Sequence, residues 1–135
     1  GVLGLGALVL GARSAVGVDC DLASLMLARR NATRNRLQLD LRAAEDAERE
    51  DWACVSLYTP SSEQKGNTPF PVGLPAGDRY DIVVANMTSG PVIRLAPLLA
   101  GAVAPGGYIA MSGIREEAEA DVIQAYSSEG IQVAR

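Results

Sequence analysis

The sequence predicts a doubly wound α/β domain, in which a mostly parallel sheet carries helices on both faces. Two observations point to this class. Short apolar runs alternate with segments of helical spacing along the chain, as residues 15–36 and 80–104 illustrate. Several of the apolar runs also end in a polar residue. Strand and helix alternating in this way favour parallel strands, because each helix returns the chain across a face of the sheet.

The first elements are a helix and a strand. Residues 1–12 are apolar with interspersed glycines, and they predict a short buried helix that ends near Gly11. Residues 15–18 form an apolar run that leads into Asp19, which predicts a buried strand ending in an acid. Asp21 is then placed to cap a helix. The apolar face of that helix is expected to carry Leu22, Leu25, Met26 and Ala32.

The middle of the chain is less regular. Residues 37–41 and 54–59 are both plausible strands, and one of the two is expected to be the third strand of the sheet, with the choice left open. A charged run separates them, and a segment rich in Pro, Gly and Ser follows. We therefore expect an insertion or long loop at about residues 40–78.

The second half returns to the regular pattern. Residues 81–86 predict a buried strand, and residues 91–104 predict a helix that Pro97 kinks. A turn at Pro105–Gly107 is expected to end this helix. The remaining elements are a strand at 108–113, an amphipathic helix at 115–129 that ends before Gly130, and the start of another strand at 131–135.

Composition narrows the classes of function. The 135 residues suit one domain, and the net charge of −4 argues against direct nucleic-acid binding. No apolar stretch suggests a membrane span, and the two cysteines show no CxxC spacing. The chain has no histidine, which removes the commonest general base and most catalytic zinc sites. Chemistry that aligns two reactants around a reactive cofactor remains open, and no metal is expected.

Polar residues that end strands are the candidate site, because ligands of such sheets bind outside the carboxyl ends of the strands. Asp19 follows a strand and stands eighteen positions after Gly1, near the spacing at which an acid accepts hydrogen bonds from ribose hydroxyls. The alternative role for Asp19 is helix capping. Asn86 could hold a cofactor or an amine, or could form a turn. Ser112 is interpreted as part of an ordinary Ser-Gly turn.

The order of several motifs resembles one family. These are GVLGLGALVLGA, AVGVDCD, ARRNATRN, YDIVVANMTSGPVIRLAPLL and PGGYIAMSGI. Together they are similar to the PrmA-type ribosomal protein methyltransferases, which are class I, Rossmann-like enzymes that use S-adenosyl-L-methionine. The family usually reads Asn-Ile-Leu where this chain has Asn86-Met87-Thr88, and Ile where it has Cys20.

The resemblance carries expectations for the fold and the site. It implies that Asp19 binds the adenosyl ribose, that Asn86 contacts the cofactor or the incoming amine, and that Gly1 is the last glycine of a cofactor-binding loop. The catalytic residue stays unassigned. It also implies that the first strand of the family's sheet, and the final hairpin, are missing, which would leave a central gap between the strands ending at Asp19 and Asn86. The chain is then expected to be a partial cofactor-binding domain.

The expected function is methyl transfer from S-adenosyl-L-methionine to amino groups of a protein, with a ribosomal protein as the partner and no membrane or nucleic acid involved. The alternatives are a Rossmann-type NAD-dependent oxidoreductase and a fragment that is inactive by itself. The oxidoreductase would need a proton-handling group, and neither a histidine nor a Tyr-xxx-Lys pair occurs. Methylation of nucleobases would call for a stacking aromatic after Asn86, and Met87-Thr88-Ser89 supplies none. The location is expected to be cytoplasmic, or a chloroplast or mitochondrion if a targeting segment precedes the chain.

Overall fold

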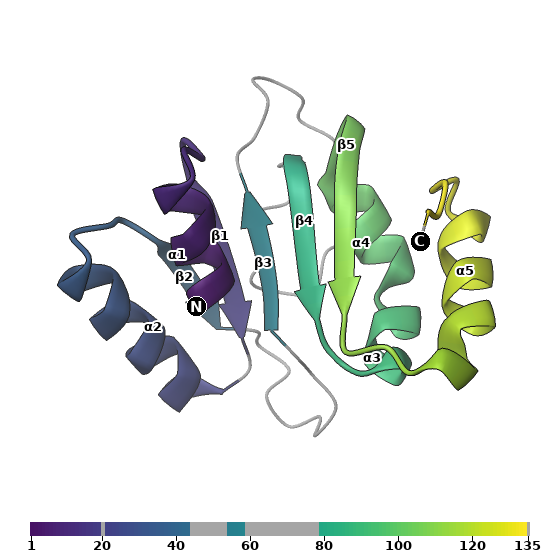
Figure 1. Ribbon diagram of the computed structural model, residues 1–135, viewed down its shortest axis with the longest axis horizontal. Helices are drawn as coiled ribbons and strands as arrows, with labels where there is room; N and C mark the ends of the chain where they lie inside the picture. The colour runs from purple at the N-terminus through teal and green to yellow at the C-terminus, as the bar shows by residue number, and fades with distance from the viewer. Residues whose placement is uncertain (20, 44–53, 59–78, 135) are drawn as a thin grey trace.

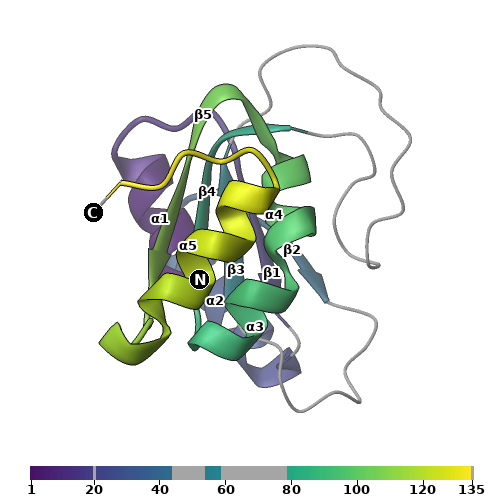
Figure 2. The same ribbon diagram turned by 90° about the vertical axis from the view of Figure 1, so that its right-hand side faces the viewer.

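A computed structural model describes residues 1–19, 21–43, 54–58 and 79–134. Within them the chain forms a five-stranded sheet with α1 on one face and α4 on the other (Figures 1 and 2). The strands are β1 (Ala15–Asp19), β2 (Asp40–Ala43), β3 (Cys54–Tyr58), β4 (Tyr80–Asn86) and β5 (Val103–Ser112). The helices are α1 (Val2–Val9), α2 (Leu22–Arg34), α3 (Ser89–Arg94), α4 (Ala96–Ala102) and α5 (Glu119–Ser128), and a short 3-10 helix, η1, covers Glu116–Ala118.

The strand order of the sheet is β2-β1-β3-β4-β5. β1 is parallel to β2 and β4 is parallel to β5, whereas β3 is antiparallel to both of its neighbours. β1, β4 and β5 therefore point in one direction and β3 in the other, as the arrows of Figure 1 show. The α/β class is confirmed. The prediction of a mostly parallel sheet holds for two of the four strand pairings and is wrong for the other two.

β3 lies at the position where a central gap was predicted. In the register of the sheet, Val55 of β3 pairs with Val18 of β1 on one side and with Ala85 of β4 on the other. This pairing satisfies backbone groups that would each cost about 1–3 kcal/mol if they were buried without a partner. Because β3 occupies this position and pairs with both neighbours, the prediction of a central gap is wrong.

Both candidate strands of the middle segment join the sheet, although only one was expected to do so. β2 begins at Asp40, inside the predicted 37–41 strand, and β3 matches the other candidate. The rest of the predicted insertion, residues 44–53 and 59–78, lies outside the described residues.

The first two helices form where they were predicted, but with different buried faces. α1 is followed by Gly11 with a φ of +103°, the left-handed conformation expected near a helix end. Its apolar side chains at Val2 and Val9 are largely exposed, so the prediction of a buried helix is wrong in part. α2 buries Ala28 and Ala32, while Leu22, Leu27 and Met26 are exposed. Small residues face inward because α2 approaches its neighbours closely.

The predicted helix over residues 91–104 is divided into α3 and α4 at Leu95. Pro97 has no backbone N–H, and its ring would collide with the carbonyl of the preceding turn of a continuous helix. A new helix with proline in its first turn avoids both problems, and α4 has this arrangement. The interruption expected at Pro97 is thus confirmed as a break.

β5 begins earlier than predicted, at Val103, so Pro105–Gly107 lie inside the strand and not in a turn before it. Two steps along β4, from Tyr80 to Ile82, match five steps along β5, from Val103 to Tyr108, which is a bulge. A Cβ at Gly107 would lie 2.6 Å from the carbonyl oxygen of Asp81. Glycine is therefore required for the two backbones to approach at the bulge.

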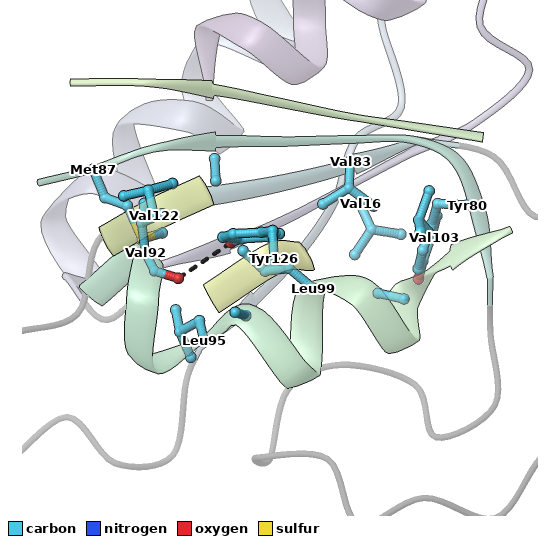
Figure 3. Close-up of a cluster of buried hydrophobic side chains, with 13 residues drawn as sticks. Val16, Tyr80, Val83, Met87, Val92, Leu95, Leu99, Val103, Val122 and Tyr126 are labelled. Carbon is cyan, nitrogen blue, oxygen red and sulfur yellow. Dashed lines mark hydrogen bonds between the residues drawn. The ribbon is translucent and has the colours of Figure 1, made fainter. Parts of the chain in front are cut away.

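A cluster of buried side chains lies between the sheet and α3, α4 and α5 (Figure 3). Val83 and Ala85 of β4 and Val16 of β1 point into it, and Tyr126 of α5 is completely buried there. The Tyr126 hydroxyl donates a hydrogen bond of 3.2 Å to the carbonyl oxygen of Val92. This cluster holds α5 against the β4–α3 part of the chain.

The end of the chain differs from the sequence prediction. α5 ends before Gly130, which has a φ of +77°, as expected. Residues 131–134 form no strand, so the predicted start of a further strand is wrong for these residues. Across the described parts of the chain, none of the helices has the length and apolar character needed to cross a membrane.

Candidate functional site

Asp19 and Asn86 are the last residues of β1 and β4, so both lie at the same edge of the sheet. Asp19 is one step beyond the Val18–Val55 pair and therefore level with Cys54, which itself pairs with Asn86. Residues directly opposite each other on paired strands project from the same face. One strand separates Asp19 from Asn86, which places them about 10 Å apart, a span comparable with that of a nucleoside.

The face that carries these two residues is the one opposite the main core. Val18 and Ala85 belong to the buried cluster or pack against it, so their neighbours Asp19 and Asn86 project to the other side. α1 lies on that side and contacts β1 and β3. Asp19 is half-buried and Asn86 is exposed, so neither side chain points into packed interior.

The carboxylates of Asp19 and Asp21 make different hydrogen bonds, and only that of Asp21 caps α2. Asp21 caps α2: its carboxylate accepts hydrogen bonds from the Ala23 and Ser24 backbone N–H groups at 3.0 and 3.1 Å, and from the Ser24 hydroxyl at 2.7 Å. Asp19 accepts one bond, at 3.0 Å, from the backbone N–H of Asp21 through Oδ1. With capping assigned to Asp21, the Asp19 carboxylate keeps acceptor capacity for a ligand.

The Asp21 cap can be tested by stability. The hydrogen bonds from the Ser24 hydroxyl, and then from the backbone of Ala23 and Ser24, lower the pKa of Asp21. We expect Asp21→Ala to lower the melting temperature by a few degrees at pH 7, and Asp21→Ser, which keeps a capping oxygen, to lower it less. Because the folded pKa is lowered, the stabilisation from the carboxylate is present above about pH 4 and is lost as the pH falls below that value. Equal melting temperatures of wild type and Asp21→Ala at pH 7 would contradict this assignment.

Asn86 belongs to a small polar group at the ends of β4 and β5. Asn86 pairs in register with Ser112, whose hydroxyl donates a hydrogen bond of 2.9 Å to Asn86 Oδ1. The backbone N–H of Met87 donates to the carbonyl oxygen of Ser112 at 3.1 Å. The two strand ends are therefore tied together by one backbone and one side-chain hydrogen bond.

The chain turns sharply at Gly113, which follows Ser112 with a φ of +84°. A Cβ at this position would lie 2.8 Å from the carbonyl oxygen of Met87 and 3.5 Å from Asn86 Oδ1. Glycine is therefore required for the chain to turn this close to the Met87 carbonyl group. The Met87 carbonyl oxygen and Asn86 Oδ1, both hydrogen-bond acceptors, thus lie near each other beside Gly113 at the edge of the sheet.

Gly1 is the third predicted site residue, and the structure gives it a packing role. It precedes α1 as the N-cap residue, and a Cβ there would lie 2.4 Å from the Cβ of Ala28 in α2. Glycine is needed for this contact whether or not a ligand is bound. The role of Gly1 in cofactor binding stays a prediction.

Two features of this edge were not predicted from the sequence. The Met87 carbonyl has no side-chain signature, and Ser112 was interpreted as part of a turn. The Ser-Gly pair after a strand was the available signal, because it marks a glycine in an unusual backbone conformation. Among the described residues, no group of His, Cys, Asp and Glu side chains is arranged to hold a metal ion.

Comparison with known proteins gives the family. The family model described as ribosomal protein L11 methyltransferase (PrmA) matches residues 1–135. The chain belongs to the PrmA family. This confirms the resemblance on which the prediction of a methyltransferase rested, and it does not support the oxidoreductase alternative.

Individual relatives agree with the family assignment. A ribosomal protein L11 methyltransferase of Pseudomonas putida strain F1 is 37% identical over 129 residues, which cover 96% of this chain and 36% of that protein. One from Pseudomonas paraeruginosa strain PA7 is 37% identical over 131 residues, covering 95% of this chain and 35% of that protein. The chain thus spans about a third of the length of these curated relatives. No solved structure was found to match the chain.

Proposed function

We propose that this chain contributes the cofactor-binding part of an enzyme that transfers methyl groups from S-adenosyl-L-methionine to amino groups of a ribosomal protein, with L11 as the substrate. The observation that carries the proposal is the PrmA family match over residues 1–135. The names of the relatives specify L11 as the protein that they methylate. The arrangement of Asp19 and Asn86 at one edge of the sheet is consistent with this chemistry.

The residues at this edge fit the cofactor in chemical terms. The hydroxyl groups of a ribose are donors, and the half-buried Asp19 carboxylate, with one oxygen bonded to the Asp21 N–H, has acceptor capacity left for them. Asn86 stands one strand away on the same face. A nucleoside lying along the edge could therefore reach from Asp19 toward Asn86.

The acceptors beside Gly113 fit an amine. The N–H groups of a neutral amine are donors, while its lone pair must face the methyl group that it attacks. Asn86 Oδ1 and the Met87 carbonyl oxygen lie near each other beside Gly113, so together they could hold two N–H groups and orient the lone pair. The bound cofactor supplies a methyl group on a good leaving group, and the contribution of this chain is alignment.

The proposal is tested by labelled methyl transfer. Full-length protein that carries these residues is incubated with S-adenosyl-L-methionine bearing a labelled methyl group and purified L11, and labelled L11 is expected. A saturable NADH titration without methyl transfer would instead favour the oxidoreductase. Transfer by the isolated 135 residues would show that the chain is active without further domains.

Asp19→Ala is expected to weaken binding of S-adenosylhomocysteine by about 10- to 100-fold, the loss of one or two charge-assisted hydrogen bonds. Calorimetric titration of the full-length protein measures this change. Asp81→Ala is a matched control, because Asp81 is an exposed acid near the other end of β4. Unchanged affinity in Asp19→Ala would remove Asp19 from the cofactor site.

A further inference from the structure

Ser112 makes a contact that a turn-forming serine would not make. Serines in turns bond backbone groups a few residues away in the sequence. The Ser112 hydroxyl instead donates to the side chain of Asn86, 26 residues away on the neighbouring strand, at 2.9 Å. The interpretation of Ser112 as ordinary turn chemistry is therefore incomplete.

The backbone around this pair is held in place from two sides. Asn86 and Ser112 are partners in the parallel register of β4 and β5, and the Met87 N–H bonds the Ser112 carbonyl oxygen at 3.1 Å. The next residue, Gly113, turns the chain with a φ of +84°. The Ser112 hydroxyl thus projects from a defined position, whereas the terminal torsion of an asparagine side chain is intrinsically broad.

The hydrogen bond has a consequence for the direction of the carboxamide. The oxygen accepts from Ser112, so Oδ1 lies on the β5 side of Asn86, beside Gly113 and near the Met87 carbonyl oxygen. An oxygen has two lone pairs, and one remains available for a second donor. If the carboxamide were turned over, its NH2 group would take the place of Oδ1, and as a donor it could not accept a hydrogen bond from the N–H groups of an amine.

We infer that Ser112 is a positioning residue, whose hydroxyl orients the Asn86 carboxamide so that Oδ1 can accept a hydrogen bond from the substrate amine. The inference rests on the proposed methyl transfer and adds a determinant to the same site. Both side chains are exposed, so water can replace the bond in the unbound protein and its loss should leave the folded state intact. Loss of this hydrogen bond should instead slow catalysis, because an unrestrained carboxamide must be ordered each time that an amine binds.

The test compares Ser112→Ala, Ser112→Val and Ser112→Thr in the full-length protein. We expect Ala and Val to lower kcat for methyl transfer to L11 by about 5- to 10-fold, the effect of one neutral hydrogen bond. Thr, which keeps the hydroxyl and has nearly the shape of Val, should restore most of the rate. Binding of S-adenosylhomocysteine and the melting temperature should stay near the wild-type values.

A double-mutant cycle separates positioning from a general structural effect. In an Asn86→Ala background, Ser112→Ala should cause no further loss of kcat, because the side chain that it orients is absent. An equal loss in both backgrounds, or Val as active as Thr, overturns the inference while the proposed function stands. A wild-type protein that transfers no methyl group overturns the proposed function, and this inference with it.

Discussion

Replacing Asn86 with alanine is expected to lower kcat for methyl transfer by about 100-fold, the size of effect seen when one preorganised polar group is removed from an active site. The carboxamide is exposed at the end of β4, and its oxygen lies near the Met87 carbonyl oxygen beside Gly113. Its removal leaves one acceptor where the structure offers two. Initial rates at saturating cofactor and L11 measure the loss.

Asn86→Ala should affect catalysis and leave folding unchanged. Since the side chain is exposed, the melting temperature of Asn86→Ala should stay close to that of the wild type. Asp81→Ala, a change at an exposed position near the other end of the same strand, should keep full activity. An active enzyme whose rate is unchanged by Asn86→Ala would exclude this side chain from the site.

Replacing Tyr126 with alanine is expected to destabilise the protein by about 3–5 kcal/mol, the range for removing a large buried aromatic side chain. Tyr126 is completely buried among residues of β4, α3 and α4, as Figure 3 shows. Tyr126→Phe keeps the ring and loses only the bond to the Val92 carbonyl, so it should cost about 1 kcal/mol. Denaturant unfolding monitored by circular dichroism measures both changes.

The same residue predicts a response to alkaline pH. Burial raises the pKa of Tyr126 to about 12 from the ordinary value of 10.0. Between these values the unfolded chain releases the phenolic proton while the folded chain keeps it, so stability falls as the pH rises through this window. Tyr126→Phe should lack this part of the fall. Identical alkaline profiles for wild type and Tyr126→Phe would show that Tyr126 is accessible to solvent.

Part of the site at the sheet edge could be predicted from the rule that ligands bind outside the carboxyl ends of parallel strands. Polar residues that end parallel strands gather at one edge, which is why the sequence predicts Asp19 and Asn86 as site residues, and β1 and β4 do point the same way. The rule held although β3 lies between them, because a strand antiparallel to both neighbours leaves those neighbours parallel to each other. Ser112 was missed as a partner because its hydrogen bond joins two strands whose register no local pattern reveals.

The errors in the fold have related causes. Residues 37–41 and 54–59 each had the apolar residues of a plausible strand, but strand character does not specify which neighbour a strand pairs with or in which direction. α1 and α2 carry enough large apolar side chains to bury wide faces, but several of these side chains are exposed. The close contact between the start of α1 and α2 is made by the small residues Gly1 and Ala28. Pro105–Gly107 was interpreted as a turn, because a bulge inside a strand uses the same residue types.

By itself the sequence determined the α/β class, the bounds of most helices and strands, the Asp21 cap and the position of Asp19 and Asn86 at strand ends, since these depend on residues close together in the chain. The tertiary structure decided the central place and reversed direction of β3, the faces that α1 and α2 bury, and the contact between Ser112 and Asn86. Those features depend on residues distant in the sequence, whose pairing is selected by the packing of the whole sheet.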